Sequence, residues 1–294
     1  MNKNFNKVKQ LDMWVGPVDP QPIDGGLTNA NFLVHDGGRD YFVRVGEDVT
    51  AHGIVRAHEV EASRAAHEAG ISPRVIKARP GIMVLEFIEG RTLTEQDVQQ
   101  DEYLEAIIPL VRTCHRRVPQ YFRGNALIFW VFQVVRNYAG LLTEGGSRMV
   151  SRLPDLMDSA EILEQAVGPV EIVFGHNDLL AANFIDDGKR LWLVDYDYGG
   201  FNSPLFDLGG LASNNSLSPA QETWMLEEYF GEVTSERRWV SYQAMKCASL
   251  LRESMWSMVS EIHSALDFDY RAYTEENLSR YEAALSHFMA LKQS

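Results

Sequence analysis

The sequence predicts an α+β protein with a small β-rich N-terminal lobe and a larger, mainly helical C-terminal lobe. Strand patterns gather in the first third of the chain, and most later segments have the apolar spacing of helices. One short hairpin pattern interrupts those helices within residues 171–198. With 294 residues, 45% of them hydrophobic, the chain is long and apolar enough to fold as a globular protein of two lobes.

The first lobe is expected to begin with a β-hairpin, because apolar runs at residues 30–35 and 40–45 flank the turn sequence Asp36-Gly37-Gly38. A helix is expected over residues 54–69, and Gly70 is typical of the position just after a helix. Two further apolar runs complete a small sheet, at residues 73–77 and 82–88.

The second lobe is expected to follow a hinge near residues 86–90, where Glu89-Gly90 ends the strand patterns. Thr94 can cap its first helix, because Asp97 stands three residues further on. Helical patterns then continue to the break at Gly168-Pro169.

Short strands are expected next, around the turn Asp186-Asp187-Gly188, and the residues after Pro204 are again predicted to be helical. The longest uncharged stretch near the middle, residues 124–135, is bracketed by arginines. It is too short to span a bilayer, so we interpret it as a buried helix and expect no membrane insertion.

Charge and cysteine content exclude several classes of protein. The formal net charge of −14 argues against a bulk electrostatic nucleic-acid binder, which needs an excess of Lys and Arg. Cys114 and Cys247 stand outside any CxxC or Cys/His cluster, so we expect neither a disulfide scaffold nor structural zinc. The N-terminal lysines are not followed by an apolar run, which argues against a signal peptide and favours a cytoplasmic, reducing location.

The most informative motif is His176-x-Asp178-x4-Asn183, followed by a hairpin pattern and by Asp195 at the end of an apolar strand. Phosphoryl transfer uses these residue types, because one carboxylate can orient the attacking hydroxyl while carboxylate and amide oxygens bind magnesium. A tight loop and the hairpin would bring the three oxygen donors together. Each of these residues alone would be a chance occurrence. Their order, with a hairpin after the motif and Asp195 at the end of an apolar strand, is what favours a catalytic loop.

With these motifs the chain resembles the choline/ethanolamine kinase family, within the protein-kinase-like phosphotransferases, and more distantly the aminoglycoside phosphotransferases. The resemblance covers about residues 22 to 283 and is most specific in three segments, HNDLLAAN (176–183), VDYDYGGFNSPLFDLG (194–209) and WSMVSEIHSALDFDYRAY (256–273).

The resemblance implies a bilobal protein-kinase-like fold, with residues 1–88 as the nucleotide-binding lobe and residues 89–294 as the catalytic and substrate-binding lobe. It implies ATP- and Mg²⁺-dependent phosphorylation of the hydroxyl group of an amino alcohol such as choline or ethanolamine. Because relatives often dimerise, a homodimer is one option. Alternatives are a related kinase for an aminoglycoside or thiamine, and a non-catalytic nucleotide-binding pseudokinase.

Roles in the catalytic loop follow from the same resemblance. Asp178 is expected to be the catalytic base, and Asn183 and Asp195 the magnesium ligands. His176 is expected to brace the loop rather than to act as a general base. Asp207 resembles the aspartate that fastens the loop backbone, with an ordinary helix N-cap as the alternative.

The nucleotide half is expected in the first lobe. Residues 25–29 match the family pattern GG[LM][ST]N, whose glycines let backbone N–H groups approach phosphate oxygens. Arg44 falls where related kinases grip the phosphates, and Glu59 is favoured over Glu61 as its ion-pair partner. The implied set is Gly25, Gly26, Thr28, Asn29, Arg44 and Glu59, together with Glu86 and Ile88, which flank the adenine edge.

The substrate pocket is expected to be aromatic, because a quaternary ammonium is held by aromatic faces and nearby carboxylates. The candidates are Asp197, Tyr198, Trp256, Phe268 and Tyr273, with ordinary core packing as the alternative for Phe268. Three positions depart from the family pattern: Leu180 stands where a glutamine is expected, Asn214 where an acidic residue is expected, and Glu253 where a second tryptophan is expected. The incomplete cage would suit a primary ammonium or a mixed polar cation at least as well as trimethylammonium.

Overall fold

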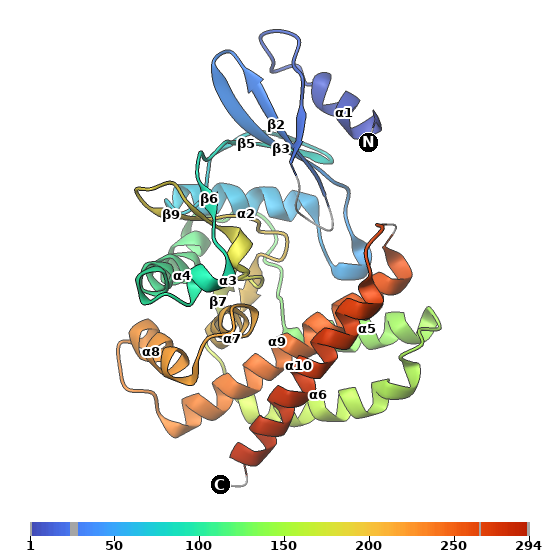
Figure 1. The fold of residues 1–294 in the computed structure, drawn as a ribbon, viewed down its shortest axis with the longest axis vertical. Helices are drawn as coiled ribbons and strands as arrows, with labels where there is room; N and C mark the ends of the chain where they lie inside the picture. The colour runs from blue at the N-terminus through green and yellow to red at the C-terminus, as the bar shows by residue number, and fades with distance from the viewer. Residues whose placement is uncertain (1, 24–28, 265, 293–294) are drawn as a thin grey trace.

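The computed structural model describes residues 2–23, 29–264 and 266–292, so the predicted nucleotide residues Gly25, Gly26 and Thr28 lie outside the described residues. Its architecture confirms the predicted α+β fold of two unlike lobes. Figure 1 shows a small sheet with one N-terminal helix above a larger body of helices.

The small lobe is built on a five-stranded antiparallel sheet in the order β1-β2-β3-β5-β4. Its strands are β1 (Gln21–Ile23), β2 (Ala30–Asp36), β3 (Arg39–Val45), β4 (Val75–Arg79) and β5 (Ile82–Glu86). The predicted hairpin is β2–β3, and its turn places both Gly37 and Gly38 at positive φ, where glycine avoids the cost of a Cβ. Strand β1 is too short to have been predicted from an alternating pattern.

Two helices flank this sheet. Helix α1 (Asn2–Lys9) buries Val8 in a small core with Phe32, Val34 and Val43. Helix α2 (Arg56–Glu68) follows a single helical turn at Thr50–His52 and packs its alanines into the core of the large lobe. In Figure 1 it lies between the sheet and the helices below, so it can carry side chains to the junction of the lobes.

The large lobe consists mostly of helices, as predicted. Their bounds are α3 (Glu95–Val98), α4 (Asp101–Tyr121), α5 (Val131–Glu144), α6 (Leu153–Val167), α7 (Pro204–Asn214), α8 (Pro219–Phe230), α9 (Glu236–His263) and α10 (Tyr270–Leu291). From Ser241 to Ser260 nearly every residue of α9 is buried, because α5, α6, α7 and α10 pack around it. Thr94 caps α3 with the predicted contribution of Asp97.

Short strands hold the loops at the top of the large lobe. They are β6 (Arg91–Thr92), β7 (Val173–Gly175), β8 (Phe184–Asp186), β9 (Leu191–Leu193) and β10 (Gly200–Asn202). β8 and β9 form the predicted hairpin and β6 adds to it, while β7 pairs with β10. Both cysteines are buried and free.

The predicted buried helix over residues 124–135 is wrong in its first half, because α5 begins only at Val131. The residues before it pair with β10 instead: the Phe201 N–H donates to the Leu127 carbonyl at 2.8 Å, and the Phe129 N–H donates to the Phe201 carbonyl at 2.9 Å. Ile128 is 75% exposed, so this apolar stretch does not form a single buried helix. Within the described residues, no helix combines the length and the apolar character that crossing a membrane requires.

Candidate active site

The loop between β7 and β8 carries the motif that the sequence singled out. Asn183 ends a helical turn at Ala181–Asn183, and its Nδ2 donates to the Asp178 carbonyl at 2.9 Å. The Val194 N–H donates to the Asn183 carbonyl at 3.0 Å, which sets Asp195 beside the loop. Loop and hairpin therefore bring Asp178, Asn183 and Asp195 to one region, as the order of the motif predicted.

Asn177 fixes the shape of this loop, and sequence reasoning did not single it out. Its φ of +66° is left-handed, a conformation that asparagine tolerates better than most side chains. The buried Nδ2 group donates to the Tyr198 carbonyl at 2.8 Å, and Oδ1 accepts from Asn202 Nδ2 at 3.1 Å. Asn177 thus ties the loop between β7 and β8 to the segment after Asp195.

Asp207 fastens the loop backbone. Its carboxylate accepts from the N–H groups of His176 and Asn177, both at 2.7 Å. The N-cap of α7 is Ser203, whose hydroxyl accepts from the Leu205 N–H. The fastening interpretation is confirmed, and the alternative of an ordinary N-cap is wrong.

His115 supports Asp207 from α4 and was not predicted. Its Nε2 lies 2.8 Å from the Asp207 carboxylate and its Nδ1 lies 2.7 Å from the Tyr229 hydroxyl, with all three side chains buried. In the sequence, His115 stands out only as a histidine on an otherwise apolar helix face. That pattern does not reveal which side chain it contacts.

His176 is buried; its Nε2 lies 2.9 Å from the Val194 carbonyl oxygen, and its ring centroid lies 4.8 Å from that of Tyr196. Because Val194 accepts, Nε2 carries the proton, and burial lowers the pKa of His176 so that the ring is neutral. This contact links the loop to the strand that ends at Asp195. The geometry fits the bracing role predicted for His176.

Arg44 on β3 is the centre of an ion-pair network between the lobes. Its Nη1 donates to Glu59 at 2.7 Å, to Asp195 at 2.6 Å and to Asp197 at 3.0 Å. Glu61 pairs instead with Arg64 on the exposed side of α2, so Glu59 is the partner of Arg44. Burial alone would raise the pKa of Asp195, but the Arg44 guanidinium lowers it below its usual range.

Arg56, which sequence reasoning missed, completes the network. Its Nη1 donates to Glu59 at 2.8 Å and to Asp197 at 2.7 Å. Carboxylate oxygens of Glu59, Asp195 and Asp197 lie within 4.8 Å of one another, a spacing that also suits a metal ion. In the structure, the guanidinium groups of Arg44 and Arg56 offset much of the repulsion among these three carboxylates.

A slot between the lobes lies next to Arg44. Strands β3 and β5, helix α2, the segments after α2 and β5, and the β8–β9 hairpin with the residues after it contribute its lining. The slot is lined by Phe42, Arg44, Glu59, Ser63, Ser72, Pro73, Met83, Leu85, Glu86, Phe87, Ile88, Ile185, Val194 and Asp195. Apolar walls that end at an arginine and a carboxylate provide the chemistry to hold a flat heterocycle with phosphates.

The four predicted aromatic residues gather near α9. Trp256 Nε1 donates to the Tyr198 hydroxyl at 2.8 Å. The ring of Tyr273 lies 6.5 Å from that of Trp256 and 5.7 Å from that of Phe268. Phe268 is 43% exposed, so core packing does not account for it.

Two charged residues of α9 lie between these aromatic rings and Asp178. Arg252 stacks on Tyr198, with its guanidinium carbon 4.3 Å from the ring centroid, and donates to Glu253 at 2.9 Å. Glu253 also accepts from the Tyr273 hydroxyl at 2.8 Å. Burial raises the pKa of Asp178 to about 7; Arg252 opposes this shift, and Glu253 adds to it.

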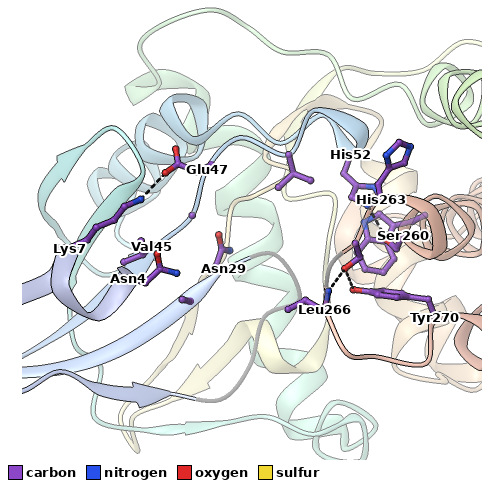
Figure 2. Close-up of a pocket in the computed structure, with 15 residues that line it drawn as sticks. Asn4, Lys7, Asn29, Val45, Glu47, His52, Ser260, His263, Leu266 and Tyr270 are labelled. Atoms are coloured by element: carbon purple, nitrogen blue, oxygen red, sulfur yellow. Dashed lines mark hydrogen bonds and ion pairs between the residues drawn. The ribbon is translucent and has the colours of Figure 1, made fainter. Parts of the chain in front are cut away.

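A cavity of about 430 Å³ lies beside Trp256, between the small sheet and the C-terminal helices. In Figure 2, Asn29, Val45 and Glu47 face it from the small lobe, and His52 and Ser260 face it from the opposite side. His52 Nε2 lies 3.0 Å from the Ser260 hydroxyl, and Asn29 Nδ2 donates to Asp197 at 3.4 Å. The cavity thus lies between Asn29, the described residue of the predicted phosphate loop, and α9.

Comparison with known proteins identifies the same group of enzymes. The family model described as choline/ethanolamine kinase matches residues 21–225. Protein LicA of Haemophilus influenzae is 25% identical over 258 residues, which cover 84% of this chain and 75% of LicA. A probable ethanolamine kinase of Arabidopsis thaliana is 26% identical over 289 residues, covering 85% of this chain and 75% of that protein.

A solved structure agrees in fold over its full length. The choline/ethanolamine kinase family protein of Mesorhizobium loti superposes with a TM-score of 0.78 at 24% identity, covering 100% of this chain and 99% of that chain.

Proposed function

The chain belongs to the choline/ethanolamine kinase family, and we propose that it transfers the γ-phosphoryl group of ATP to the hydroxyl group of a small amino alcohol such as ethanolamine or choline. One observation carries the proposal. Asp178 lies between two different environments, with the Arg44–Asp195 ion pair at the interlobe slot on one side and Arg252 and Glu253 of α9 on the other. A base between a nucleotide site and an acceptor site is what phosphoryl transfer requires.

ATP binding would use the slot and its charged end. The adenine ring would lie between the apolar side chains of β3, β5 and β8, against the backbone of Glu86 and Ile88. Arg44 would donate to phosphate oxygens while Glu59 holds its guanidinium in place. Gly25, Gly26, Thr28 and Asn29 remain the predicted phosphate loop.

Asp178 would orient the acceptor hydroxyl and take up its proton. A carboxyl group with a pKa of about 7 exchanges a proton readily near neutral pH, which suits a general base. Asp207 and Asn177 hold the loop backbone just before Asp178, so most of the catalytic effect would come from positioning.

We further propose that Asn183 and Asp195 hold Mg²⁺. Their amide and carboxylate oxygens are the hard donors that this ion prefers, and Asp195 keeps 25% of its side chain exposed. When bound, the ion would neutralise phosphate charge. A lobe boundary between residues 88 and 89, a cytoplasmic location and a homodimer remain predictions.

The test is a coupled assay of ADP release with ATP, Mg²⁺ and a panel of hydroxylated amines. We expect turnover with amino alcohols, and we expect Asp178→Asn to lower kcat by about 10²–10⁴-fold or more while it preserves the thermal shift caused by ATP. Asp158→Asn, at an exposed position of α6, is the matched control and should retain wild-type turnover.

Two results would contradict the proposal. Near-wild-type turnover by Asp178→Asn would remove the assigned base. Turnover by the wild-type protein of aminoglycosides or thiamine but of no amino alcohol would place it among the related kinases, and no ADP release with any acceptor would favour a pseudokinase.

A further inference from the structure

The guanidinium group of Arg252 is a cation that belongs to the protein itself, and it stacks on the ring of Tyr198, one of the side chains predicted to bind the substrate. Its side chain is 5% exposed, and its guanidinium carbon lies 4.3 Å from the Tyr198 centroid and 5.8 Å from that of Phe129. Guanidinium groups stack well on aromatic faces, and a buried cation gains more from such a face than an exposed one. The face of Tyr198 toward Arg252 is therefore not open to the cation of a ligand.

Trp256, the second predicted aromatic wall, is covered in a similar way. The ring of His52 stacks on it, with centroids 4.9 Å apart and planes 27° from parallel. Tyr270 and Tyr273 meet it edge to face, and Trp256 is only 6% exposed. Burial lowers the pKa of His52 to about 3, so this covering ring is neutral.

The space next to Asp178 is small and mostly polar. Its lining includes Asp178, Asn214, Ser249, Arg252 and Glu253. Asn214, Ser249 and Glu253 offer oxygen acceptors. A primary ammonium can donate three hydrogen bonds to such acceptors, whereas a trimethylammonium donates none and depends on aromatic faces.

We propose that Arg252 is a specificity-determining residue: its guanidinium fills the aromatic position that a quaternary ammonium would need, so the site selects amino alcohols with a primary ammonium group. This inference rests on the proposed kinase function. It explains why Glu253 can stand at a position where the family pattern has an aromatic residue. With Arg252 beside it, Glu253 is held in place and one of its oxygens is paired with a cation.

The experiment compares kcat/KM for ethanolamine, its N-methyl and N,N-dimethyl derivatives and choline. For the wild-type protein we expect kcat/KM to fall with each added methyl group. Arg252→Met should raise the ratio of choline to ethanolamine by about tenfold, because it frees the Tyr198 face for a ligand cation. Arg252→Lys keeps a cation at this position and should leave the ratio close to that of the wild type.

Arg271→Met is the matched control, because the same change is made at a side chain that is 71% exposed on the neighbouring helix. It should leave the whole series unchanged. The ATP-induced thermal shift of each variant shows whether the fold and the nucleotide site are intact.

Several results would overturn the inference. Equal kcat/KM values of the wild-type protein for choline and ethanolamine would overturn it. This comparison needs no variant, so it decides even if Arg252→Met fails to fold. An unchanged ratio in a folded Arg252→Met protein also overturns it and leaves the kinase proposal standing. If no amino alcohol is phosphorylated at all, the kinase proposal fails, and calorimetric binding of tetramethylammonium still decides: tighter binding by Arg252→Met supports the role of Arg252, and equal binding refutes it.

Discussion

At the scale of single residues, the pKa of Asp178 connects structure and chemistry most directly. Burial raises it to about 7. Arg252 on α9 opposes the shift, while Glu253 on the same helix and Asp195 and Asp197 after β9 reinforce it. A carboxyl group with a raised pKa becomes protonated at a higher pH. Asp178 therefore stops acting as a base at a higher pH than an ordinary aspartate would.

The pH dependence of catalysis should report this group. We expect kcat/KM for an amino alcohol to rise between about pH 5 and pH 8 with an apparent pKa near 7, because only the ionised carboxylate can accept the hydroxyl proton. Initial rates of ADP release at constant ionic strength measure the profile. In Arg252→Met the midpoint should move upward, since a cation that lowers the pKa is gone. A rate that stays constant through this range would contradict the assignment of the base.

Other residues of the site show what a linear motif can and cannot reveal. Asp178, Asn183 and Asp195 are close in the chain or joined by one hairpin, so their meeting could be predicted. His115 and Arg56 reach the site from α4 and α2. Their partners there, Asp207 and Asp197, lie 92 and 141 residues away along the chain, so sequence neighbours do not indicate them. Arg252 stands one residue before the noted Glu253, but its stacking on Tyr198 depends on how α9 is oriented.

At the scale of elements, the crossing of α7 and α9 positions residues on two sides of the small space next to Asp178. α7 carries Asp207, which holds the backbone of His176 and Asn177, and α9 carries Arg252 and Glu253. A Cβ atom added at Gly209 would lie 2.9 Å from both Cα and N of Lys246, inside the normal contact distance to backbone that cannot swing away. The crossing is this close only because residue 209 has no side chain.

Gly209→Ala should therefore destabilise the protein by about 1–3 kcal/mol, because the two helices must move apart. Urea denaturation gives the free energy of unfolding, and the coupled assay should show lower kcat as well. Gly210→Ala is the control on the same helix: its Cβ would meet only the Ser249 hydroxyl at 3.4 Å, and alanine is the better helix former. Equal effects of the two substitutions would show that the close approach does not set the packing.

The first half of the 124–135 stretch shows the limit of periodicity at this scale. An apolar run of that length fits a buried helix, but it fits irregular backbone that pairs with a distant strand equally well. The pairing partner, Phe201, lies more than seventy residues away along the chain. No local signal could favour it.

At the scale of the whole molecule, the two lobes meet through charge. Arg44, Arg56 and Glu59 belong to β3 and α2, whereas Asp195 and Asp197 follow β9. Three carboxylates and two guanidinium groups leave one unit of negative charge at the junction when all are ionised. A triphosphate would enter a region that repels it unless cations accompany it.

Mg²⁺ should accordingly strengthen the stabilisation by ATP. We expect ATP with Mg²⁺ at about 100 times its Kd to stabilise the protein by about 2.7 kcal/mol, seen as a rise in Tm, and ATP with EDTA to have a much smaller effect. Arg44→Met should reduce the rise, whereas Arg64→Met should not, because that side chain is 50% exposed and pairs with Glu61. An equal rise in Tm with EDTA would argue against a metal at Asn183 and Asp195.

The sequence by itself determined the two-lobed α+β fold, most of its helices and its two hairpins, because alternating and helical apolar spacing are local properties. A motif within 20 residues also predicted that Asp178, Asn183 and Asp195 come together. The sequence also predicted the pairing of Arg44 with Glu59. Only the tertiary structure decided that Arg252 and His52 cover the aromatic rings expected to bind a cation. The face of a ring that stays open depends on how helices and loops far apart in the chain pack together, and residue identity alone does not specify it.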